Sequence, residues 1–525
     1  MAQINVSGVT FCYEGSYDNI FEQVSFQIDT DWKLGLIGRN GKGKTTFLNL
    51  LLGKYPYEGS IATSVQFDYF PYEIAKEEEE KNTIDVIERL YPQYELWKIC
   101  RELELLKTDA EILYRPYGTL SFGERTKVML AVLFSKDNYF LLIDEPTNHL
   151  DMEAREVLRD YLKKKKSFIL VSHDRWLLDE CVDHVLVLNR ATIEVEKGNY
   201  SSWWENKQKR DAFELDENAK LKKQIGKLEE AARRTAIWAD KVESSKIGFN
   251  PTEEHDRFLD TRAYIGEKSR RMQQRRKNLE RRQQVAITDK KQLLKNIEET
   301  APLKLAPLSH HKSMYVYAKE LSLSYEPGKP VVEGVNFKIE RGERIWLQGK
   351  NGCGKSSIIK AICSAEGVSL LNGHPNEKEK TTEVKIESGI LDVAHGLRIS
   401  YINQDTSFLK GKLNDYIEQN ELSNSLFKAV LRQLDFERVQ FDKSMEEYSE
   451  GQKKKVLIAS SLLQQAHLYI WDEPLNYIDI YSRMQIEQLI QKYQPTMLLV
   501  EHDRTFGESV ATRMVPLSVV SSVSF

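Results

Sequence analysis

Two stretches of the chain repeat one alternation of apolar and polar residues. Residues 4–29 read INVSGVTFCYEGSYDNIFEQVSFQID, and residues 315–340 read YVYAKELSLSYEPGKPVVEGVNFKIE. Each alternates around a tyrosine, passes through a turn and alternates again, which is typical of half-buried strands. The apolar segments that follow, FLNLLLG and IIKAICS, have helical spacing. The pattern therefore predicts two similar halves that begin with strands and continue into a helix.

Further along each half, short apolar runs end in polar residues. These runs are YFLLIDE (139–145) and LVSHD (170–174) in the first half, and LYIWDE (468–473) and LVEHD (499–503) in the second. Continuous apolar runs of this length suit parallel strands that are buried on both faces. We therefore expect an α/β domain over residues 1–203 and another over residues 311–525.

The region between the halves has a different period. From 205 to 243, apolar or small residues recur at alternating steps of four and three, a heptad pattern. They are Leu221, Ile225, Leu228, Ala232, Thr235, Ala239 and Val242. Turn signals follow in 243–256, then a second helical stretch over about 258–299 and a Pro-containing linker, APLKLAPLS. Residues 204–310 are thus predicted to form an antiparallel helical hairpin with its tip at about 244–258, each arm ~60 Å long if about 40 residues rise ~1.5 Å each.

Composition limits the class of protein. The 525 residues leave room for two to four domains, and 41% hydrophobic with 29% charged residues is ordinary for a globular protein. The net charge of −4 excludes a global polycation, and five scattered cysteines without a CxxC pair argue against a zinc or iron–sulfur site. No signal peptide and no run of about 18 apolar residues is seen, so we expect a cytoplasmic protein without a membrane span.

Both halves carry a phosphate-binding loop. Residues 38–45 read GRNGKGKT and residues 349–356 read GKNGCGKS, and both fit G-x-x-x-x-G-K-[ST]. In such a loop backbone N–H groups surround the phosphates, the Lys reaches the β- and γ-phosphates, and the Ser or Thr hydroxyl binds Mg²⁺. Two such loops predict two sites for ATP.

The polar ends of the apolar runs supply the remaining chemistry of phosphoryl transfer. Asp144 and Asp472 would hold Mg²⁺, and Glu145 and Glu473 would polarise the attacking water. His173 and His502 end the next strands and can reach the γ-phosphate. A lone His is commonly a structural group, but its recurrence at matching places in both halves favours a catalytic role.

A third repeated motif reads LSFGERTKVMLAVLF (120–134) and YSEGQKKKVLIASSLL (448–463). A Ser-x-Gly that opens a helix offers a hydroxyl, close backbone approach and a positive dipole end to an anion. The motif is weak alone, but it is specific some twenty residues ahead of an apolar strand that ends in Asp-Glu.

Together these motifs resemble the ABC ATPase cassette, and the resemblance covers both halves, hereafter cassette 1 (1–203) and cassette 2 (311–525). It implies a head-to-tail sandwich with two composite sites. Site 1 joins the 38–45 loop, Asp144, Glu145 and His173 to Ser449–Gly451. Site 2 joins the 349–356 loop, Asp472, Glu473 and His502 to Ser121–Gly123.

The resemblance also assigns roles residue by residue. Tyr13 and Tyr325 match the aromatic that stacks on adenine, and Asp151 and Asp479 match the loop that links the sites. The implied Mg²⁺ contacts are Thr45, Asp144, Ser356, Gln404 and Asp472. The implied ATP contacts are Tyr13, Gly38, Asn40, Gly41, Gly43, Lys44, Thr45, Thr46, Ser121, Gly123, Tyr325, Gly349, Asn351, Gly352, Gly354, Lys355, Ser356, Ser357, Gln404, Ser449 and Gly451.

Two departures from the family pattern distinguish the cassettes. Cassette 1 has Tyr72 where cassette 2 has the metal-contacting Gln404, and cassette 2 has Leu475 where cassette 1 has Thr147. Neither change removes the Lys, the metal-binding Asp or the Glu. We expect both sites to bind ATP and to differ in rate.

The hairpin carries an uneven charge. Between 262 and 291 eleven Lys or Arg face three acidic residues, and Lys268, Arg271, Arg275 and Arg282 recur at helical spacing. A solvated helix face is the plain alternative, but a local excess of eight on an otherwise acidic protein favours contact with phosphate backbones. The tip has turn signals and no diagnostic residue. The predicted RNA contacts are Lys246, Ile247, Phe249, Lys268, Arg271, Arg275 and Arg282.

Two fused cassettes with a charged hairpin and no membrane segment resemble the ABC-F group, and GNYSSWWE (198–205) with AYIGEKSRRMQQRRKNLERRQ (263–283) resembles its Lsa-type antibiotic-resistance members. The resemblance implies a monomer that binds the bacterial ribosome, at large-subunit rRNA and the P-site tRNA, and neither DNA nor membrane. It implies protection against lincosamide, pleuromutilin and streptogramin A drugs. The alternatives are an ABC-F factor of ordinary translation and, further off, a transporter ATPase.

Overall fold

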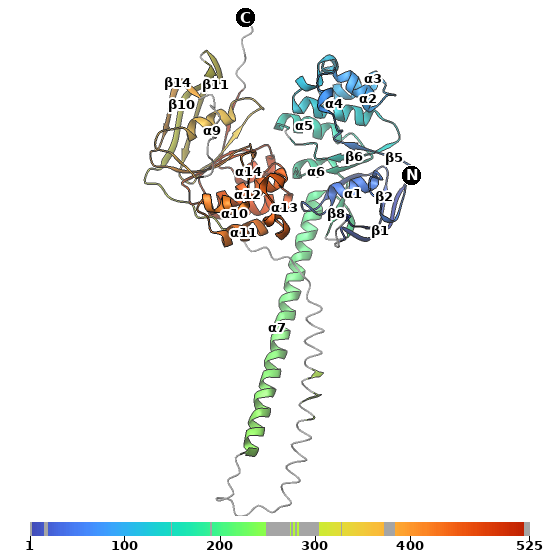
Figure 1. Cartoon of the computed structure of the whole chain (residues 1–525), viewed down its shortest axis with the longest axis vertical. Coiled ribbons are helices and arrows are strands. Elements are labelled where there is room, and N and C mark those ends of the chain that lie inside the picture. The colour runs from blue at the N-terminus through green and yellow to red at the C-terminus, as the bar shows by residue number, and fades with distance from the viewer. Residues whose placement is uncertain are drawn as a thin grey trace, which may run out of the picture. The chain divides into compact units, whose positions relative to one another are not determined.

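The computed structural model describes residues 3–14, 19–148, 150–189, 192–247, 274, 277–278, 281–282, 304–326, 328–371 and 384–518. The chain divides into two compact units, one made of Met1–Trp203 with Ala301–Phe525 and the other of Trp204–Thr300. The first unit holds both cassettes and the second holds most of the long helix α7 (Figure 1).

Cassette 1 is built on two sheets. A three-stranded antiparallel sheet has the order β2-β1-β4, and a six-stranded sheet has the order β5-β6-β7-β3-β8-β9, parallel except for β9 at its edge. The strands are β1 (Gln3–Phe11), β2 (Phe21–Asp29), β3 (Lys33–Ile37), β4 (Glu58–Ala62), β5 (Gln66–Phe70), β6 (Tyr139–Asp144), β7 (Phe168–Val171), β8 (His184–Leu188) and β9 (Ile193–Lys197).

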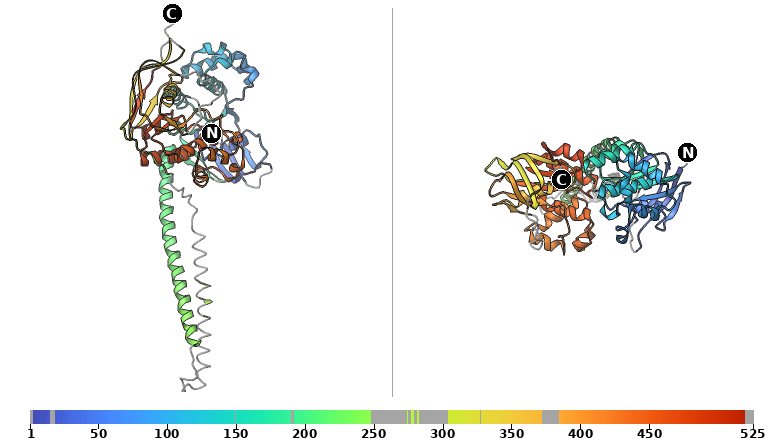
Figure 2. Two further views of the ribbon diagram at one scale, coloured as in Figure 1. Left: turned by 60° about the vertical axis from the view of Figure 1, so that its left-hand side comes forward. Right: turned by 90° about the horizontal axis from the view of Figure 1, so that it is seen from above.

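The central strands of that larger sheet are apolar because helices cover them. All four residues of β7 are buried, as are Phe140 to Ile143 of β6. The helices are α1 (Lys44–Leu51), α2 (Thr83–Leu90), α3 (Leu96–Leu105), α4 (Phe122–Ser135), α5 (Met152–Leu162) and α6 (Arg175–Cys181), with 3₁₀ turns at Lys76–Glu78, Ala110–Tyr114 and Tyr117–Thr119. Figure 2 shows these helices packed on the strands of the cassette.

Cassette 2 repeats the arrangement with sheets of order β11-β10-β14 and β13-β15-β16-β17-β12-β18. Its strands are β10 (Met314–Glu326), β11 (Lys329–Glu340), β12 (Arg344–Gln348), β13 (Ser369–Leu370), β14 (Lys385–Val393), β15 (Arg398–Ile402), β16 (Leu468–Asp472), β17 (Met497–Val500) and β18 (Arg513–Pro516). Its helices are α9 (Lys355–Cys363), α10 (Leu413–Gln419), α11 (Asn424–Gln433), α12 (Glu450–Leu463), α13 (Ile480–Tyr493) and α14 (Arg504–Val510), with 3₁₀ turns at Arg438–Asp442 and Met445–Glu447.

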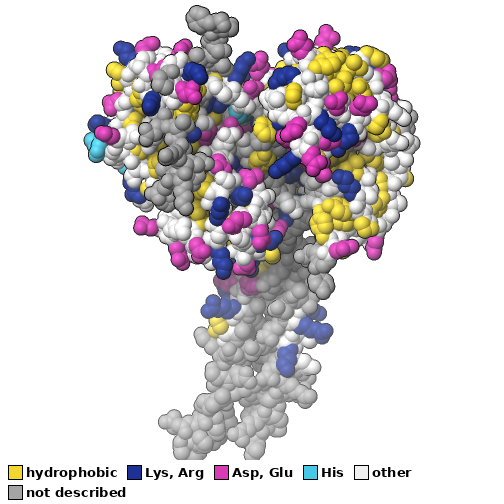
Figure 3. Space-filling view, turned by 45° about the horizontal axis from the view of Figure 1, so that its top comes forward, with side chains coloured by type: hydrophobic (Ala, Val, Ile, Leu, Met, Phe, Trp, Pro, Cys, Tyr) yellow, Lys and Arg dark blue, Asp and Glu magenta, His cyan; other side chains and the backbone are white. Residues whose placement is uncertain are grey.

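The predicted α/β class with two cassettes is confirmed. The apolar runs predicted as buried strands are β6, β7, β16 and β17, and β6 and β16 end at Asp144 and Asp472. These carboxylates therefore lie at the carboxyl edge of each parallel sheet, where the phosphate loops also emerge. Surface charge on the cassettes is mixed: Lys and Arg alternate with Asp and Glu over the face in Figure 3.

The linker helix α7 spans Tyr200–Ile247, which corrects the predicted limits of 205–243. It begins early because Asp179 and Asn199 accept from the N–H groups of Ser201 (2.6 Å) and Ser202 (3.0 Å), which caps the first turn. It continues past Ser244 because no Gly or Pro occurs between Ser244 and Gly248. Lys246 and Ile247, predicted in the tip, therefore belong to the helix.

The heptad stripe of α7 is visible in the exposure of its residues. Ile225 is buried and Leu221 and Leu228 are half-buried, whereas Lys223 and Lys227 are exposed. On the predicted second arm, residues 277, 278, 281 and 282 are helical, and Lys277, Arg281 and Arg282 are exposed. Phe249, Lys268, Arg271 and Arg275 lie outside the described residues. In the part of the chain that the structure covers, no helix is both long enough and apolar enough to cross a membrane.

Candidate active site

The two phosphate loops have the same backbone geometry. Gly43 (φ 93°) and Gly354 (φ 88°) precede the first helical residues of α1 and α9 in the left-handed region, which glycine alone adopts without strain. Lys44 Nζ donates to the carbonyl oxygen of Gly38 at 2.8 Å and to Asn40 Oδ1 at 3.1 Å. Lys355 Nζ donates to the carbonyl of Gly349 at 2.8 Å. Both ammonium groups thus lie over the loops, where a phosphate group would be held.

A hydroxyl and a carboxylate meet beside each loop. Thr45 Oγ1 donates to Asp144 Oδ2 at 2.9 Å, and Ser356 Oγ donates to Asp472 Oδ2 at 2.9 Å. Burial raises the pKa of Asp144 and raises that of Asp472 to about 6. A bound cation would stabilise the ionised form of each buried carboxylate more than the hydroxyl hydrogen bond does. Two hard oxygen atoms beside a phosphate loop fit Mg²⁺, which keeps several waters and binds few protein ligands. Thr45 with Asp144, and Ser356 with Asp472, would hold it.

The next residue in each cassette is the glutamate predicted to position water. Glu145 (φ 50°) and Glu473 (φ 48°) both have left-handed backbones, which is strained for a non-glycine residue and is typical of functional sites. His502 Nε2 makes a hydrogen bond of 3.2 Å with Glu473 Oε1. His173 Nε2 lies 3.3 Å from Glu145 Oε1, but that oxygen has no hydrogen-bond partner among the described residues.

The two glutamates have different surroundings. Glu473 Oε2 accepts from Gln404 Nε2 at 2.9 Å and from Asn476 Nδ2 at 2.8 Å. Burial opposes ionisation of Glu473, but the hydrogen bond and charge of His502, with Lys355 and Lys454, outweigh it and lower its pKa to about 2. Burial and the neighbouring charge of Asp144 raise the pKa of Glu145 to about 8. Near neutral pH, Glu473 is ionised and Glu145 is mostly protonated.

The glutamine position explains part of this difference. Phe70 pairs with Ile143 as Ile402 pairs with Trp471, so Tyr72 occupies in cassette 1 the place of Gln404. The Tyr72 hydroxyl donates to Asp68 Oδ2 at 2.6 Å, and not to Glu145. Lys136 Nζ also binds Asp68 Oδ2, at 2.6 Å, and lies 5.2 Å from the centre of the Tyr72 ring. This cluster holds Tyr72 away from the glutamate that Gln404 serves in the other cassette.

A residue that no sequence motif marked reaches the metal position of site 1. The Tyr69 hydroxyl donates to Asp144 Oδ2 at 3.2 Å. Burial and the charge of Asp144 raise the pKa of Tyr69, so the hydroxyl remains a donor. Only the register of β5 against β6 brings the two together.

The signature motifs open helices as predicted. Ser121 and Ser449 cap α4 and α12, accepting from the N–H groups of Glu124 and Gln452 at 3.3 Å. A Cβ atom on Gly451 would lie 2.6 Å from the carbonyl oxygen of Tyr477, so only glycine fits there. The start of α12 is therefore close to neighbouring backbone, and both helices present N–H groups at their first turn.

Two cavities each bring together part of a predicted composite site; Lys44, Thr45 and Asp144 do not line the first, and Asp472 does not line the second. A cavity of about 500 Å³ is lined by Asn40, Gly41, Glu145 and His173 of cassette 1 and by Ser449 to Gln452 of cassette 2. A cavity of about 850 Å³ is lined by Ser121 and Gly123 of cassette 1. Its cassette 2 residues include Gly352, Gly354, Lys355, Ser356, Ser357, Gln404, Glu473 and His502. Each cavity takes residues from both cassettes.

The predicted adenine-stacking tyrosines are held by the first helix of each cassette. Tyr13 Oη lies 2.7 Å from Thr46 Oγ1, and Tyr325 Oη lies 3.0 Å from Ser357 Oγ. The Tyr13 ring is 40% exposed and also contacts Tyr55 edge-on, with 5.8 Å between ring centres. The matching bonds place both rings beside a phosphate loop.

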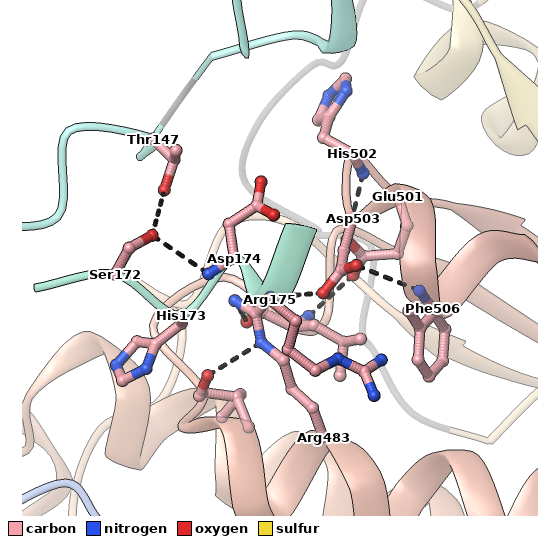
Figure 4. Close-up of polar contacts among 12 residues, drawn as sticks. Thr147, Ser172, His173, Asp174, Arg175, Arg483, Glu501, His502, Asp503 and Phe506 are labelled. Atoms are coloured by element: carbon pink, nitrogen blue, oxygen red, sulfur yellow. Dashed lines mark hydrogen bonds and ion pairs between the residues drawn. The ribbon is translucent and has the colours of Figure 1, made fainter. Parts of the chain in front are cut away.

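Buried charges connect the histidine loops of the two sites (Figure 4). Arg155 Nη1 lies 3.2 Å from Asp174 Oδ2, and Arg483 Nη1 lies 2.7 Å from Asp503 Oδ2. Between the cassettes, Arg175 Nη2 binds Glu487 Oε2 at 2.7 Å. Asp174 and Asp503 follow the two histidines directly, so each buried pair lies beside a histidine loop.

The exchange of Thr147 for Leu475 has a compensating partner. Thr147 Oγ1 lies 3.3 Å from Ser172 Oγ, which also accepts from the N–H of Asp174 at 3.1 Å. In cassette 2 the N–H of Leu475 donates to Glu501 Oε1 at 2.9 Å, and Glu501 stands where cassette 1 has Ser172. The two hydroxyl groups that pair in cassette 1 are therefore replaced in cassette 2 by an apolar side chain and by a carboxylate that accepts a backbone N–H.

Comparisons with known proteins agree with this geometry. The profile of the ABC transporter family matches residues 21–148 and 332–476. Ribosome protection protein VmlR of Bacillus subtilis is 27% identical over 517 residues, which is 96% of this chain and 85% of that protein. ABC transporter F family member 5 of Arabidopsis thaliana is 24% identical over 573 residues, covering 98% of this chain and 74% of that protein.

Among solved structures, the archaeal ribosome recycling factor aABCE1, in complex with stalk protein aP1, matches with a TM-score of 0.58 and 18% identity. The match covers 97% of this chain and 87% of that one, and it bears on the fold alone. With two matching cassettes and a full set of catalytic groups, the chain is an ATP hydrolase.

Proposed function

We propose that this chain, which belongs to the ABC transporter family of ATPases and to its ABC-F group, acts on the bacterial ribosome. In its ATP-bound form it would occupy the tRNA exit site, contact large-subunit rRNA and the P-site tRNA, and protect the peptidyl-transferase centre from lincosamide, pleuromutilin and streptogramin A drugs. ATP hydrolysis would release it. The observation that carries the proposal is the pair of composite sites in a chain whose cassettes are separated by a long, charged helical segment.

Closure of the composite sites follows from their construction. Each cavity is complete only when the phosphate loop of one cassette meets the signature of the other. Bound ATP would be held in site 1 by Lys44 and the N–H groups at the start of α12, and in site 2 by Lys355 and the N–H groups at the start of α4. When present, Mg²⁺ would neutralise phosphate charge at the Thr45–Asp144 and Ser356–Asp472 pairs. Glu473 is held by three donors in an orientation suited to a water-positioning base.

The segment between the cassettes would supply the contact with RNA. The described basic residues of its second arm, Lys277, Arg281 and Arg282, are exposed, and the sequence from 262 to 291 holds eleven basic and three acidic residues. In α7 itself, lysines and arginines are matched by acids, as in the Lys220–Asp216 and Arg234–Glu230 pairs at 2.7 Å and 2.6 Å. The excess of positive charge therefore belongs to the second arm, which is suited to phosphate backbones.

The central test traps the ATP-bound form. A Glu145→Gln plus Glu473→Gln double variant keeps the phosphate loops and loses hydrolysis, so it should accumulate on ribosomes when they are sedimented with ATP. The matched control changes two exposed glutamates outside both cavities, Glu58→Gln plus Glu333→Gln. A double variant that sediments with ribosomes no more than this control would refute the mechanism.

A second test concerns the basic arm. Neutralising Arg271, Arg275 and Arg282 to Gln should weaken ribosome binding and reduce the slope of log affinity against log salt by about one for each phosphate group that is no longer bound. Neutralising Lys222, Lys223 and Lys227 of α7 is the matched control. An unchanged slope for the arginine variant would mean that the face is merely solvated.

Drug susceptibility separates protection from a role in ordinary translation. Expression of the chain should raise inhibitory concentrations of the three drug classes and leave those of a small-subunit antibiotic unchanged. The Glu-to-Gln double variant should not raise them. Ribosome trapping without any change in susceptibility would favour the ABC-F translation factor.

A further inference from the structure

One position has the same backbone geometry in both cassettes and the opposite charge. Helices α3 and α11 each end in a C-cap leucine, and the next residue is Lys107 (φ 51°) or Asp435 (φ 64°). The N–H of Lys107 donates to the carbonyl of Glu104 at 2.9 Å, and that of Asp435 donates to the carbonyl of Arg432 at 3.0 Å. The fold therefore sets both side chains at equivalent places, and only the charge differs.

Asp435 lines the cavity of site 1. Its Oδ1 lies 3.5 Å from Nη1 of Arg39, the second residue of the opposite phosphate loop. Its Oδ2 is buried and has no hydrogen-bond partner among the described residues. Glu437 and Glu450 line the same cavity. The cassette 2 side of site 1 is thus acidic, and it neutralises the cation that the loop presents.

Lys107 lines the cavity of site 2, together with Lys127. Lys350, the second residue of the cassette 2 phosphate loop, also lines this cavity. The ion-pair partner of Lys350 is Glu153, whose side chain is 62% exposed. The counterpart of Lys127 is Lys455, which in site 1 is tied to buried Asp479 at 3.2 Å. No ion pair of this kind joins Lys127 to a described residue, and burial, opposed by Asp151, lowers its pKa. Site 2 therefore presents cations from both cassettes, beside Glu124, Asp151, Glu153 and Glu473, which also line it, whereas the one described Lys or Arg that lines site 1 beside its acids is the paired Lys455.

We propose that Lys107 and Asp435 give the two sites unequal affinities for nucleoside triphosphates. Site 2 fills first, and Lys107 makes it favour the triphosphate over the diphosphate. Positive side chains that face one another across a cleft attract a polyanion and gain more from each added phosphate charge. Site 1 offsets its Arg39 with Asp435 and binds triphosphate with lower affinity. The proposal rests on the composite ATP sites and not on the ribosome.

The experiment isolates each site in the full chain. Lys44→Ala leaves site 2 intact and Lys355→Ala leaves site 1 intact. Binding of a fluorescent ATP analogue and of its diphosphate is measured in each background over a range of KCl. In the site 2 background, Lys107→Asn should weaken triphosphate binding about fivefold and diphosphate binding about twofold, and Lys107→Asp should weaken triphosphate binding about twentyfold. Asn and Asp both accept the left-handed backbone.

The reciprocal change tests site 1. In the site 1 background, Asp435→Lys should strengthen triphosphate binding about fivefold and give it the steeper salt dependence of site 2. Glu421→Lys is the matched control, because Glu421 (φ 55°) follows helix α10 in the same backbone geometry, is exposed and lines neither cavity. It should change nothing.

Each variant is also measured at the site that it does not line. Lys107→Asn should leave site 1 unchanged and Asp435→Lys should leave site 2 unchanged. Equal effects at both sites, or equal losses for diphosphate and triphosphate, would overturn the proposal. Because no ribosome is present, that result would leave ribosome protection untouched, and a failure of ribosome trapping would leave these affinities untouched.

Discussion

Sites 1 and 2 share the phosphate loop, the signature, the Asp-Glu strand end and the histidine, and they differ at the glutamine position and in the contacts around the glutamates. Glu473 receives hydrogen bonds from Gln404, Asn476 and His502, whereas one oxygen of Glu145 has no hydrogen-bond partner among the described residues. The pKa of Glu473 falls to about 2 and that of Glu145 rises to about 8. The comparison teaches that repeated motifs supply the reacting groups, and that the contacts around them decide the protonation state of those groups. Asn476 and His502 have counterparts in Asn148 and His173, whereas Gln404 has none.

The strongest way to break the comparison is to remove each glutamate alone. Glu473→Gln should lower the turnover of ATP by about 10³-fold at site 2, because it replaces an ionised base that is already oriented. Glu145→Gln should lower the rate of site 1 less than Glu473→Gln lowers that of site 2, since Glu145 has no amide donor like Gln404 and one of its oxygens has no hydrogen-bond partner among the described residues. Phosphate release measured in P-loop variants that leave one site intact, Lys44→Ala or Lys355→Ala, gives the two losses separately. Equal losses at the two sites would remove the asymmetry.

Two ion pairs between the cassettes, one buried and one exposed, allow a second test. Arg175 and Glu487 are 9% and 15% exposed, whereas Arg504 and Glu156, 3.7 Å apart, are 45% and 48% exposed. Arg175→Met should lower the free energy of unfolding by about 3 kcal/mol, because it leaves Glu487 buried and unpaired. Arg504→Met should cost less than about 1 kcal/mol. Urea unfolding monitored by tryptophan fluorescence checks both, and similar losses would show that the buried pair has no special weight.

Supplying the missing amide to site 1 would sharpen the comparison. Tyr72→Gln, made with Lys355→Ala so that only site 1 works, should raise phosphate release about threefold, because an amide donor to Glu145 favours its ionised form. Tyr72→Phe is the control, since it breaks the hydroxyl bond to Asp68 without adding a donor. A rise with Phe as large as that with Gln would assign the effect to the loosened Asp68–Lys136 cluster.

Much of this architecture could be predicted from residue patterns. Contiguous apolar runs predicted β6 and β16, and the phosphate-loop and signature patterns predicted the residues that now line two cavities. Register and side-chain direction could not be predicted. Tyr69 reaches Asp144 only through the pairing of β5 with β6, and the left-handed backbones of Glu145 and Glu473 depend on tertiary packing. The limits of α7 were wrong because its cap residues come from Asp179 as well as Asn199.

The smallest expected effect concerns a pair of histidines that cassette 1 lacks. His310 and His467 lie with ring centres 5.2 Å apart, and each Nδ1 accepts a backbone N–H, from Lys312 at 3.2 Å and from Arg398 at 3.0 Å. Burial lowers the pKa of both histidines, so the folded state binds fewer protons than the unfolded chain. The charge of His311 lowers the pKa of His310 further, and the charges of His310 and Arg398 lower that of His467. Stability is then complete above about pH 6.5 and falls as the pH drops below that value.

Removing one member of this histidine pair distinguishes the cassettes by pH. Cassette 1 has Tyr139 in place of His467. His467→Asn keeps an acceptor for the N–H of Arg398 and removes the titration, so its thermal midpoint should fall about 2 °C less than that of the parent chain between pH 7 and pH 5.5. Parallel curves for the two proteins would show that the histidine pair carries no pH dependence, and that acid acts on both cassettes alike.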